Sequence, residues 1–118
     1  MAKSPFEDSA AWKKSRILVK ECYSLFGKQK DFGFRDQILR AAVSVMNNIA
    51  EGFTRSTQKE LKQFLVVAQG SCGELRSMLY CALDIGYITS SQFDNAQNLS
   101  TEVSKILQRF IETVRTKI

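Results

Sequence analysis

Apolar residues return every three or four positions along most of the chain, which is the spacing of one face of an α-helix. The pattern predicts four helices, over residues of about 9–26, 34–53, 57–85 and 90–116. One proline, Pro5, and six glycines are few breakers for 118 residues, and this favours long helices over many short strands. Short connections join antiparallel neighbours, so the prediction is an all-α, antiparallel up-down-up-down four-helix bundle that forms one domain, residues 1–118.

Two of the predicted helices begin with a recognisable start signal. Thr57 is followed three residues later by Glu60, and Thr89 is followed by Gln92. Each pair predicts a capping box, in which the threonine hydroxyl and the longer side chain satisfy backbone N–H groups of the first turn.

The second predicted helix has two apolar stripes rather than one. The first consists of Phe34, Ile38, Ala41, Val45 and Ile49, and the second of Leu39, Ala42 with Val43, Met46, Ala50 and Phe53. A helix in a bundle buries one broad face. The second stripe therefore predicts contact with a loop, a partner or another copy of the chain.

Two glycines, Gly70 and Gly73, lie inside the third predicted helix. A glycine in a helix interior costs about 1 kcal/mol relative to alanine. A glycine found inside a helix despite this cost often allows the close approach of another backbone. The pair therefore predicts a tight helix crossing at this point.

The residue types needed for catalysis are poorly represented. The chain has no histidine, no Gly-rich phosphate loop and no paired metal-ligand motif, which favours a non-enzymatic protein without a metal or a cofactor. Cys22, Cys72 and Cys81 lack C-x-x-C spacing and lie among apolar residues, so buried free thiols are expected. The alternative, a reactive thiol, would need a nearby base, and no histidine is present to supply one.

The apolar runs are short and the first residues form no apolar signal segment. No run approaches the roughly 20 residues that span a bilayer. The expectation is a soluble cytoplasmic protein with no membrane partner.

The net charge of +5 is unevenly spread if the four helices alternate in direction. One end of such a bundle gathers nine basic residues against the acidic Glu7, Asp8, Glu51, Glu60 and Glu112, a surplus of four. The nine are Lys62 and the eight candidate phosphate contacts Lys13, Lys14, Arg16, Arg55, Lys59, Arg109, Arg115 and Lys117. A cyclic oligomer would repeat this end around a ring, a geometry that attracts a phosphate backbone without reading sequence. The alternative is a solvated surface that keeps the protein soluble.

A set of polar residues lies among the apolar stripes of the second and third helices. Its members are Arg40, Ser44, Asn48, Glu51, Glu60 and Glu74. One interpretation is a recognition groove. The other is a network of hydrogen bonds between helices or between subunits that sets their register.

The central segment 41–52, Ala-Ala-Val-Ser-Val-Met-Asn-Asn-Ile-Ala-Glu-Gly, is followed by Arg55-Ser56, by Lys59-Glu60, and by Gly70-Ser71 with Glu74. These motifs resemble the bacterial four-helix-bundle family encoded in intervening sequences of 23S ribosomal RNA genes. One departure is Met46, where members of the family usually carry proline, so a straighter second helix is expected.

The resemblance implies an up-down-up-down bundle that assembles into a homo-oligomeric ring, a pentamer. A related protein, the accessory variability determinant of diversity-generating retroelements, uses a basic pentameric surface to engage nucleic acid and a reverse transcriptase. For this chain the expectation is a homo-oligomeric module that contacts phosphates of RNA or DNA without sequence specificity. Two alternatives are a protein–protein interaction scaffold without nucleic-acid binding and a bundle that holds a small molecule in its core.

Overall fold

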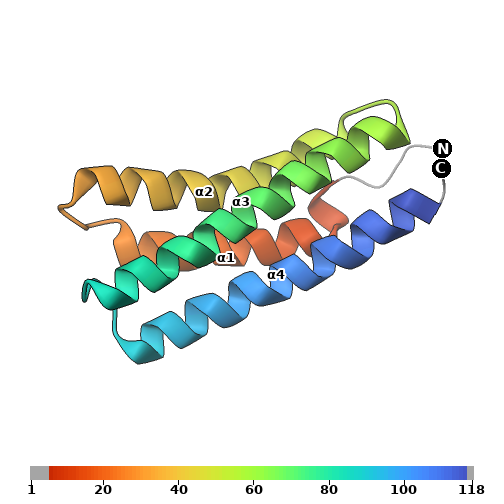
Figure 1. Ribbon diagram of the computed structural model, residues 1–118. Coiled ribbons are helices and arrows are strands. Elements are labelled where there is room, and N and C mark those ends of the chain that lie inside the picture. Colours follow the sequence, from red (N-terminus) through yellow and green to blue (C-terminus); the bar gives the residue numbers. More distant parts are fainter. Residues whose placement is uncertain (1–5, 117–118) are drawn as a thin grey trace.

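The computed structural model describes residues 6–116, with side chains described as far as Val114. A short 3₁₀ turn, η1 (Phe6–Asp8), precedes α1 (Ala10–Phe26), α2 (Phe32–Phe53), α3 (Gln58–Asp84) and α4 (Ser90–Thr116). Successive helices run in opposite directions, and the first and last described residues lie at the same end as the α2–α3 connection (Figure 1). The predicted fold class, an all-α four-helix bundle, is confirmed. Helix α2 continues without a break through Met46.

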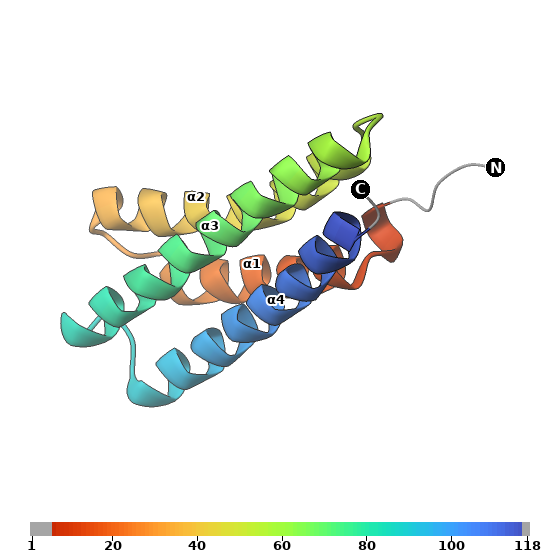
Figure 2. The same ribbon diagram turned by 45° about the vertical axis from the view of Figure 1, so that its right-hand side comes forward.

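The four helices form a square in cross-section within a rod of 48 × 20 × 20 Å. Helix α2 packs against α1 and α3, and α4 packs against the same two helices, so α1 and α3 lie on one diagonal (Figure 2). Across the other diagonal only side chains meet, as the rings of Phe53 and Phe110 do with centroids 5.9 Å apart.

This square arrangement explains the two apolar stripes of α2. Ile38, Val45 and Ile49 of the first stripe are fully buried, and Leu39 and Ala42 of the second are buried as well. Each helix of a square has two neighbours inside the chain, and for α2 these are α1 and α3. The inference that a loop, a partner or another copy must cover the second stripe is therefore wrong for Leu39 and Ala42, while Val43, Met46 and Ala50 are half-buried.

Side-chain caps place the helix starts close to where the sequence predicts them. Thr57 caps α3 by accepting from the backbone N–H of Glu60 at 3.1 Å, and its hydroxyl donates to the Glu60 carboxylate. At the start of α4 the box is reciprocal: Gln92 N–H donates to the Thr89 hydroxyl, and Thr89 N–H donates to the Gln92 side chain. The predicted capping box at Thr89 is confirmed, whereas at Thr57 the predicted N-cap forms but the Glu60 carboxylate accepts from the Thr57 hydroxyl rather than from its backbone N–H.

The close helix approach predicted at Gly70 and Gly73 is wrong. A Cβ atom added at either glycine would meet nothing within 4 Å, because both face outward on α3. The close approach occurs instead at Gly52, the buried glycine near the end of α2. A Cβ atom there would lie 3.0 Å from Leu61 Cδ1 and 3.2 Å from Phe64 Cβ, both on α3.

The opposite end of the bundle is held by aromatic rings and one hydrogen bond. The ring of Phe34 lies between those of Phe26 and Tyr87, with edge-on contacts at 5.8 and 5.2 Å. The Tyr87 hydroxyl donates to the Asp31 carboxylate at 2.5 Å, which joins the α1–α2 connection to the α3–α4 connection. Asp31 also accepts from the backbone N–H of Phe34 and so caps α2.

Replacing Tyr87 with phenylalanine is expected to change how stability depends on pH. The Tyr87 hydroxyl, and then the Phe34 N–H, lower the pKa of Asp31 below its usual 3.8, while the bond to Asp31 raises the pKa of Tyr87 above its usual 10.0. The stabilisation from Asp31 is therefore lost as pH falls through the lowered folded pKa. The stabilisation from Tyr87 is lost as pH rises through the raised pKa of Tyr87 in the folded state.

The difference in unfolding free energy between the parent and Tyr87→Phe should thus be greatest between about pH 4 and pH 10, and it should shrink outside that window. Urea unfolding at several pH values measures it. Tyr80→Phe is the control, because the Tyr80 hydroxyl makes no hydrogen bond to any residue the structure describes. A pH-independent difference for Tyr87→Phe would rule out the proposed coupling.

Candidate nucleic-acid interface

The outer face of α1 carries an exposed row of basic side chains. Lys13, Arg16 and Lys20 are all exposed, and together with Ile17 they line a shallow groove of about 350 Å³. The Arg16 guanidinium lies over the Trp12 ring, 5.7 Å from its centroid. None of the three cations forms an ion pair within the described part of the chain. This basic face of α1 is available to an anion.

Two other candidate phosphate contacts are already engaged inside the chain. Lys14 Nζ lies 3.5 Å from a carboxylate oxygen of Glu102, which ties α1 to α4. Arg55 pairs with Glu51 one turn earlier, and its guanidinium lies 4.8 Å from the centre of the Phe64 ring. The Glu51–Arg55 pair follows from the spacing of four residues along one helix, whereas the pairing of Lys14 with Glu102 depends on the packing of α1 against α4.

The remaining basic candidates lie on other elements. Lys59 is exposed at the start of α3, Lys62 is half-buried one turn later, and Arg109 is exposed on α4. Arg115 belongs to α4 but its side chain is not described, and Lys117 lies outside the described residues. These basic residues share one end of the bundle, yet α1 and α3 are diagonal, so the cations of α1 and those of α3 lie on opposite sides, with Arg109 on α4 between the two helices.

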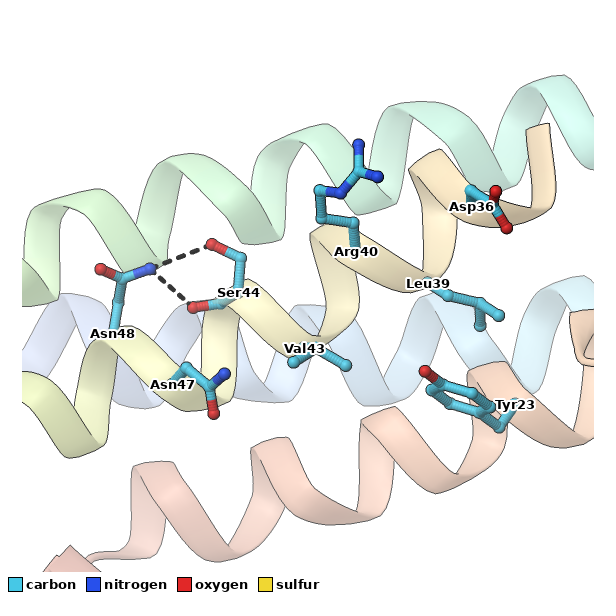
Figure 3. Close-up of a pocket in the computed structure, with 8 residues that line it drawn as sticks. All are labelled: Tyr23, Asp36, Leu39, Arg40, Val43, Ser44, Asn47 and Asn48. Carbon is cyan, nitrogen blue, oxygen red and sulfur yellow. Dashed lines mark hydrogen bonds between the residues drawn. The ribbon is translucent and has the colours of Figure 1, made fainter. Parts of the chain in front are cut away.

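The polar residues of α2 follow its outer face (Figure 3). The Ser44 hydroxyl lies 2.8 Å from that of Ser71 on α3, which links the two helices. The Asn48 side-chain NH₂ donates to the Ser44 carbonyl at 2.8 Å and to its hydroxyl at 3.0 Å. This part of the set is an interhelix hydrogen-bond network. Glu51 and Glu60 make local contacts, with Arg55 and Thr57 respectively.

Arg40 and Glu74 are not part of these bonds. Arg40 is exposed between two shallow grooves. One groove, of about 530 Å³, lies toward Tyr23 of α1 (Figure 3), and the other, of about 550 Å³, lies toward Glu74 of α3. Both grooves are open and polar in part, with Asn47 in the first. The structure thus divides the predicted polar set into an interhelix network and an exposed polar surface around Arg40.

Several apolar side chains are exposed, and the sequence pattern did not predict their exposure. Val66 and Val67 on α3 are 48% and 51% exposed, and with Lys59, Lys62 and Gln63 they line a mainly apolar groove of about 740 Å³. Ile17 on α1 is 50% exposed. The run 64–68, five apolar residues in a row, carried the signal, because one helix face cannot bury all of them.

Two of the three cysteines, Cys22 and Cys72, are buried thiols. Burial raises the pKa of Cys22 to about 12 and that of Cys72 to about 11, so both remain protonated thiols. Cys81 is exposed, so the prediction that all three thiols are buried is wrong for this residue. Among residues 6–116, no cluster of three or more Cys, Asp or Glu side chains could hold a metal ion. No helix in the same range is long and apolar enough to cross a membrane.

Comparison with known proteins finds one matching family model and a similar solved structure. A family model described as "23S rRNA-intervening sequence protein" matches residues 7–109. A solved structure from Bacteroides thetaiotaomicron, a protein of unknown function from the S23 ribosomal protein family, superposes with a TM-score of 0.82 and 27% identity. The match covers 86% of this chain and 98% of that one. No curated protein matches the chain.

Proposed function

This chain belongs to the family of 23S rRNA-intervening sequence proteins, and we propose that it is a non-enzymatic, homo-oligomeric module that contacts nucleic-acid phosphates without reading sequence. The observation that carries the proposal is the basic face of α1, where Lys13, Arg16 and Lys20 are exposed and unpaired within the described residues. Phosphate contacts position a nucleic acid but carry no sequence information. A cytoplasmic location is part of the proposal.

Self-association is supported by the exposed apolar residues on two sides of the bundle. Ile17 lies on the outer face of α1, and Val66 and Val67 lie on that of α3, the diagonal helix. Apolar surface on two opposite sides suits an assembly in which each copy uses one side for each neighbour, which closes into rings. A pentameric ring is the assembly we propose.

Charge reversal on the basic face of α1 is expected to weaken binding to any nucleic acid. The double variant Lys13→Glu with Arg16→Glu should bind mixed-sequence RNA and DNA duplexes about tenfold or more weakly at low salt, because fewer phosphates are neutralised and fewer counterions are released. The slope of log affinity against log salt should also become less steep by about 0.9 for each phosphate that is no longer neutralised. Fluorescence anisotropy at several salt concentrations measures both quantities.

The matched control is Lys28→Glu with Lys30→Glu, which makes the same change in net charge at the opposite end of the bundle. These residues should affect binding far less. An equal loss of affinity in both double variants would mean that net charge alone governs binding. Affinities in the millimolar range at low salt for the parent protein would refute the proposal.

A protein–protein interaction scaffold is the second candidate function. The mainly apolar groove beside Val66 and Val67 favours it, because phosphates do not need apolar surface. A defined protein partner that stays bound after complete nuclease digestion would favour the scaffold over nucleic-acid binding.

A further inference from the structure

We propose that the outer face of α3 is a self-complementary interface, on which α3 of a second copy of this chain packs antiparallel about a two-fold axis. The inference goes beyond the proposed function, because here a surface meets itself rather than a different surface of the next chain. Such a contact joins chains in pairs. It leaves the basic face of α1, the diagonal helix, free on the far side of each chain.

The outer face of α3 carries a seam with the spacing of a coiled coil. From Lys59 to Asp84 the seam advances by alternating steps of four and three residues, and every position on it is exposed. Its two ends lie 25 residues apart, which is about seven helical turns, so they project from the same side of the helix. Inside the chain α3 packs against α2 and α4, and the seam faces neither of them.

The seam is symmetric about its midpoint, which lies between Gly70 and Gly73 near the middle of the helix. Around a two-fold axis at that point, residues equally far from the midpoint on opposite sides meet across the interface. This register depends only on positions along one helix. It pairs Lys59 with Asp84, Gln63 with Tyr80, Val66 with Ser77, and Gly70 with Gly73.

The charges at the ends of α3 select the antiparallel direction. Lys59 lies in the first turn and Asp84 is the last residue, so each opposes the dipole of its own helix, which is positive at the N-terminus and negative at the C-terminus. Neither residue forms an ion pair within the part of the chain that the structure describes. In an antiparallel pair each Lys59 lies beside Asp84 and the negative helix end of the other copy. A parallel pair would instead bring like charges together.

The middle of the seam provides room and apolar surface for the second helix. A Cβ atom at Gly70 or Gly73 would meet nothing within 4 Å, so another backbone can approach closely there. Val66, one turn before Gly70, is 48% exposed, and the pairing covers it with Ser77 of the other copy. Each pair of chains buries this apolar surface twice. The contact also supplies a reason for two costly glycines in an exposed helix face.

Charge reversal tests the predicted register. Lys59→Asp or Asp84→Lys alone places two like-charged pairs in each dimer and should weaken pairing about tenfold or more at low salt. The two changes combined restore opposite charges and the parent's net charge, so the dissociation constant should return close to that of the parent. Light scattering over a range of protein concentrations measures it. Lys28→Asp, the same change in charge on the α1–α2 connection, is the control and should have little effect. A combined variant that pairs as weakly as the single variants overturns the inference.

The close approach and the two-fold symmetry have separate tests. Gly73→Leu should abolish pairing and keep the fold, because the added side chain meets open space within the chain. Circular dichroism checks the fold, and undiminished pairing would overturn the inference. Val66→Cys with Ser77→Cys, in a chain that also carries Cys81→Ser, should give a covalent dimer under mild oxidation. The two introduced thiols of one chain are roughly 16 Å apart and cannot link to each other. A ladder of longer oligomers would overturn the two-fold contact.

The number of chains in the assembly separates this inference from the proposed ring. A two-fold contact gives an even number of chains, either a dimer or two joined pentamers if rings close through other faces. A single pentamer that ignores the seam variants overturns the inference and keeps the ring, whereas a dimer that responds to them supports the inference and overturns the ring. A protein that stays monomeric overturns both. Phosphate binding by α1 is decided separately by the anisotropy measurement.

Discussion

Replacing Gly52 with valine is expected to lower the free energy of unfolding by about 1 to 3 kcal/mol, because overpacking a close helix contact forces the helices apart. A Cβ atom at Gly52 would already lie 3.0 Å from Leu61 Cδ1, 3.2 Å from Phe64 Cβ and 3.3 Å from the Leu61 carbonyl oxygen. The last of these atoms belongs to the backbone, so a rotamer change cannot relieve the conflict. The two methyl carbons that valine adds beyond Cβ would increase this steric conflict.

The control for this prediction is Gly70→Ala. Its Cβ atom meets nothing within 4 Å, so only the gain in helix propensity, about 1 kcal/mol, should remain, and the protein should become more stable. Urea unfolding of both variants at one protein concentration measures the two effects, since self-association would raise apparent stability with concentration. If Gly52→Val is as stable as the parent, α2 and α3 do not approach closely at this point.

Truncating Phe26 to alanine is expected to be more damaging, with a loss of about 3 to 5 kcal/mol in unfolding free energy. Phe26 is fully buried at the end of α1, and its ring meets that of Phe34, which in turn meets Tyr87. The truncation leaves a cavity at the point where both connections at this end of the bundle are anchored. The surrounding rings, held by Tyr87 and Asp31, have little freedom to close it.

Phe32→Ala is the matched control, because Phe32 lies at the same end of the bundle but is 60% exposed. It should change the unfolding free energy far less than Phe26→Ala, because little buried apolar surface is removed and no cavity forms. Thermal and urea unfolding give both values. Similar losses of stability in the two variants would show that the buried aromatic rings do not anchor this end.

The buried face of each helix and the helix starts could be predicted from the sequence alone. The three-to-four spacing of apolar residues predicts which positions share a face, and Leu65, Ala68, Cys72 and Leu75 of α3 are indeed fully buried. The N-cap at Thr57 and the capping box at Thr89 were also predictable, because each depends on residues three positions apart. The family resemblance predicted from the segment 41–52 agrees with the family model that matches residues 7–109.

The tertiary structure decided which surface meets which. Gly52 and Gly70 are both helical glycines, and only the rotation of α3 against α2 puts the first at a close approach and the second in open space. The same arrangement pairs Lys14 with Glu102, 88 positions later in the chain, while Lys13 next to it stays exposed. Helical periodicity specifies a face of one element. The neighbour that covers a face is set by the packing of all four helices together, so the division of the basic residues between α1 and α3 could be read only from the folded chain.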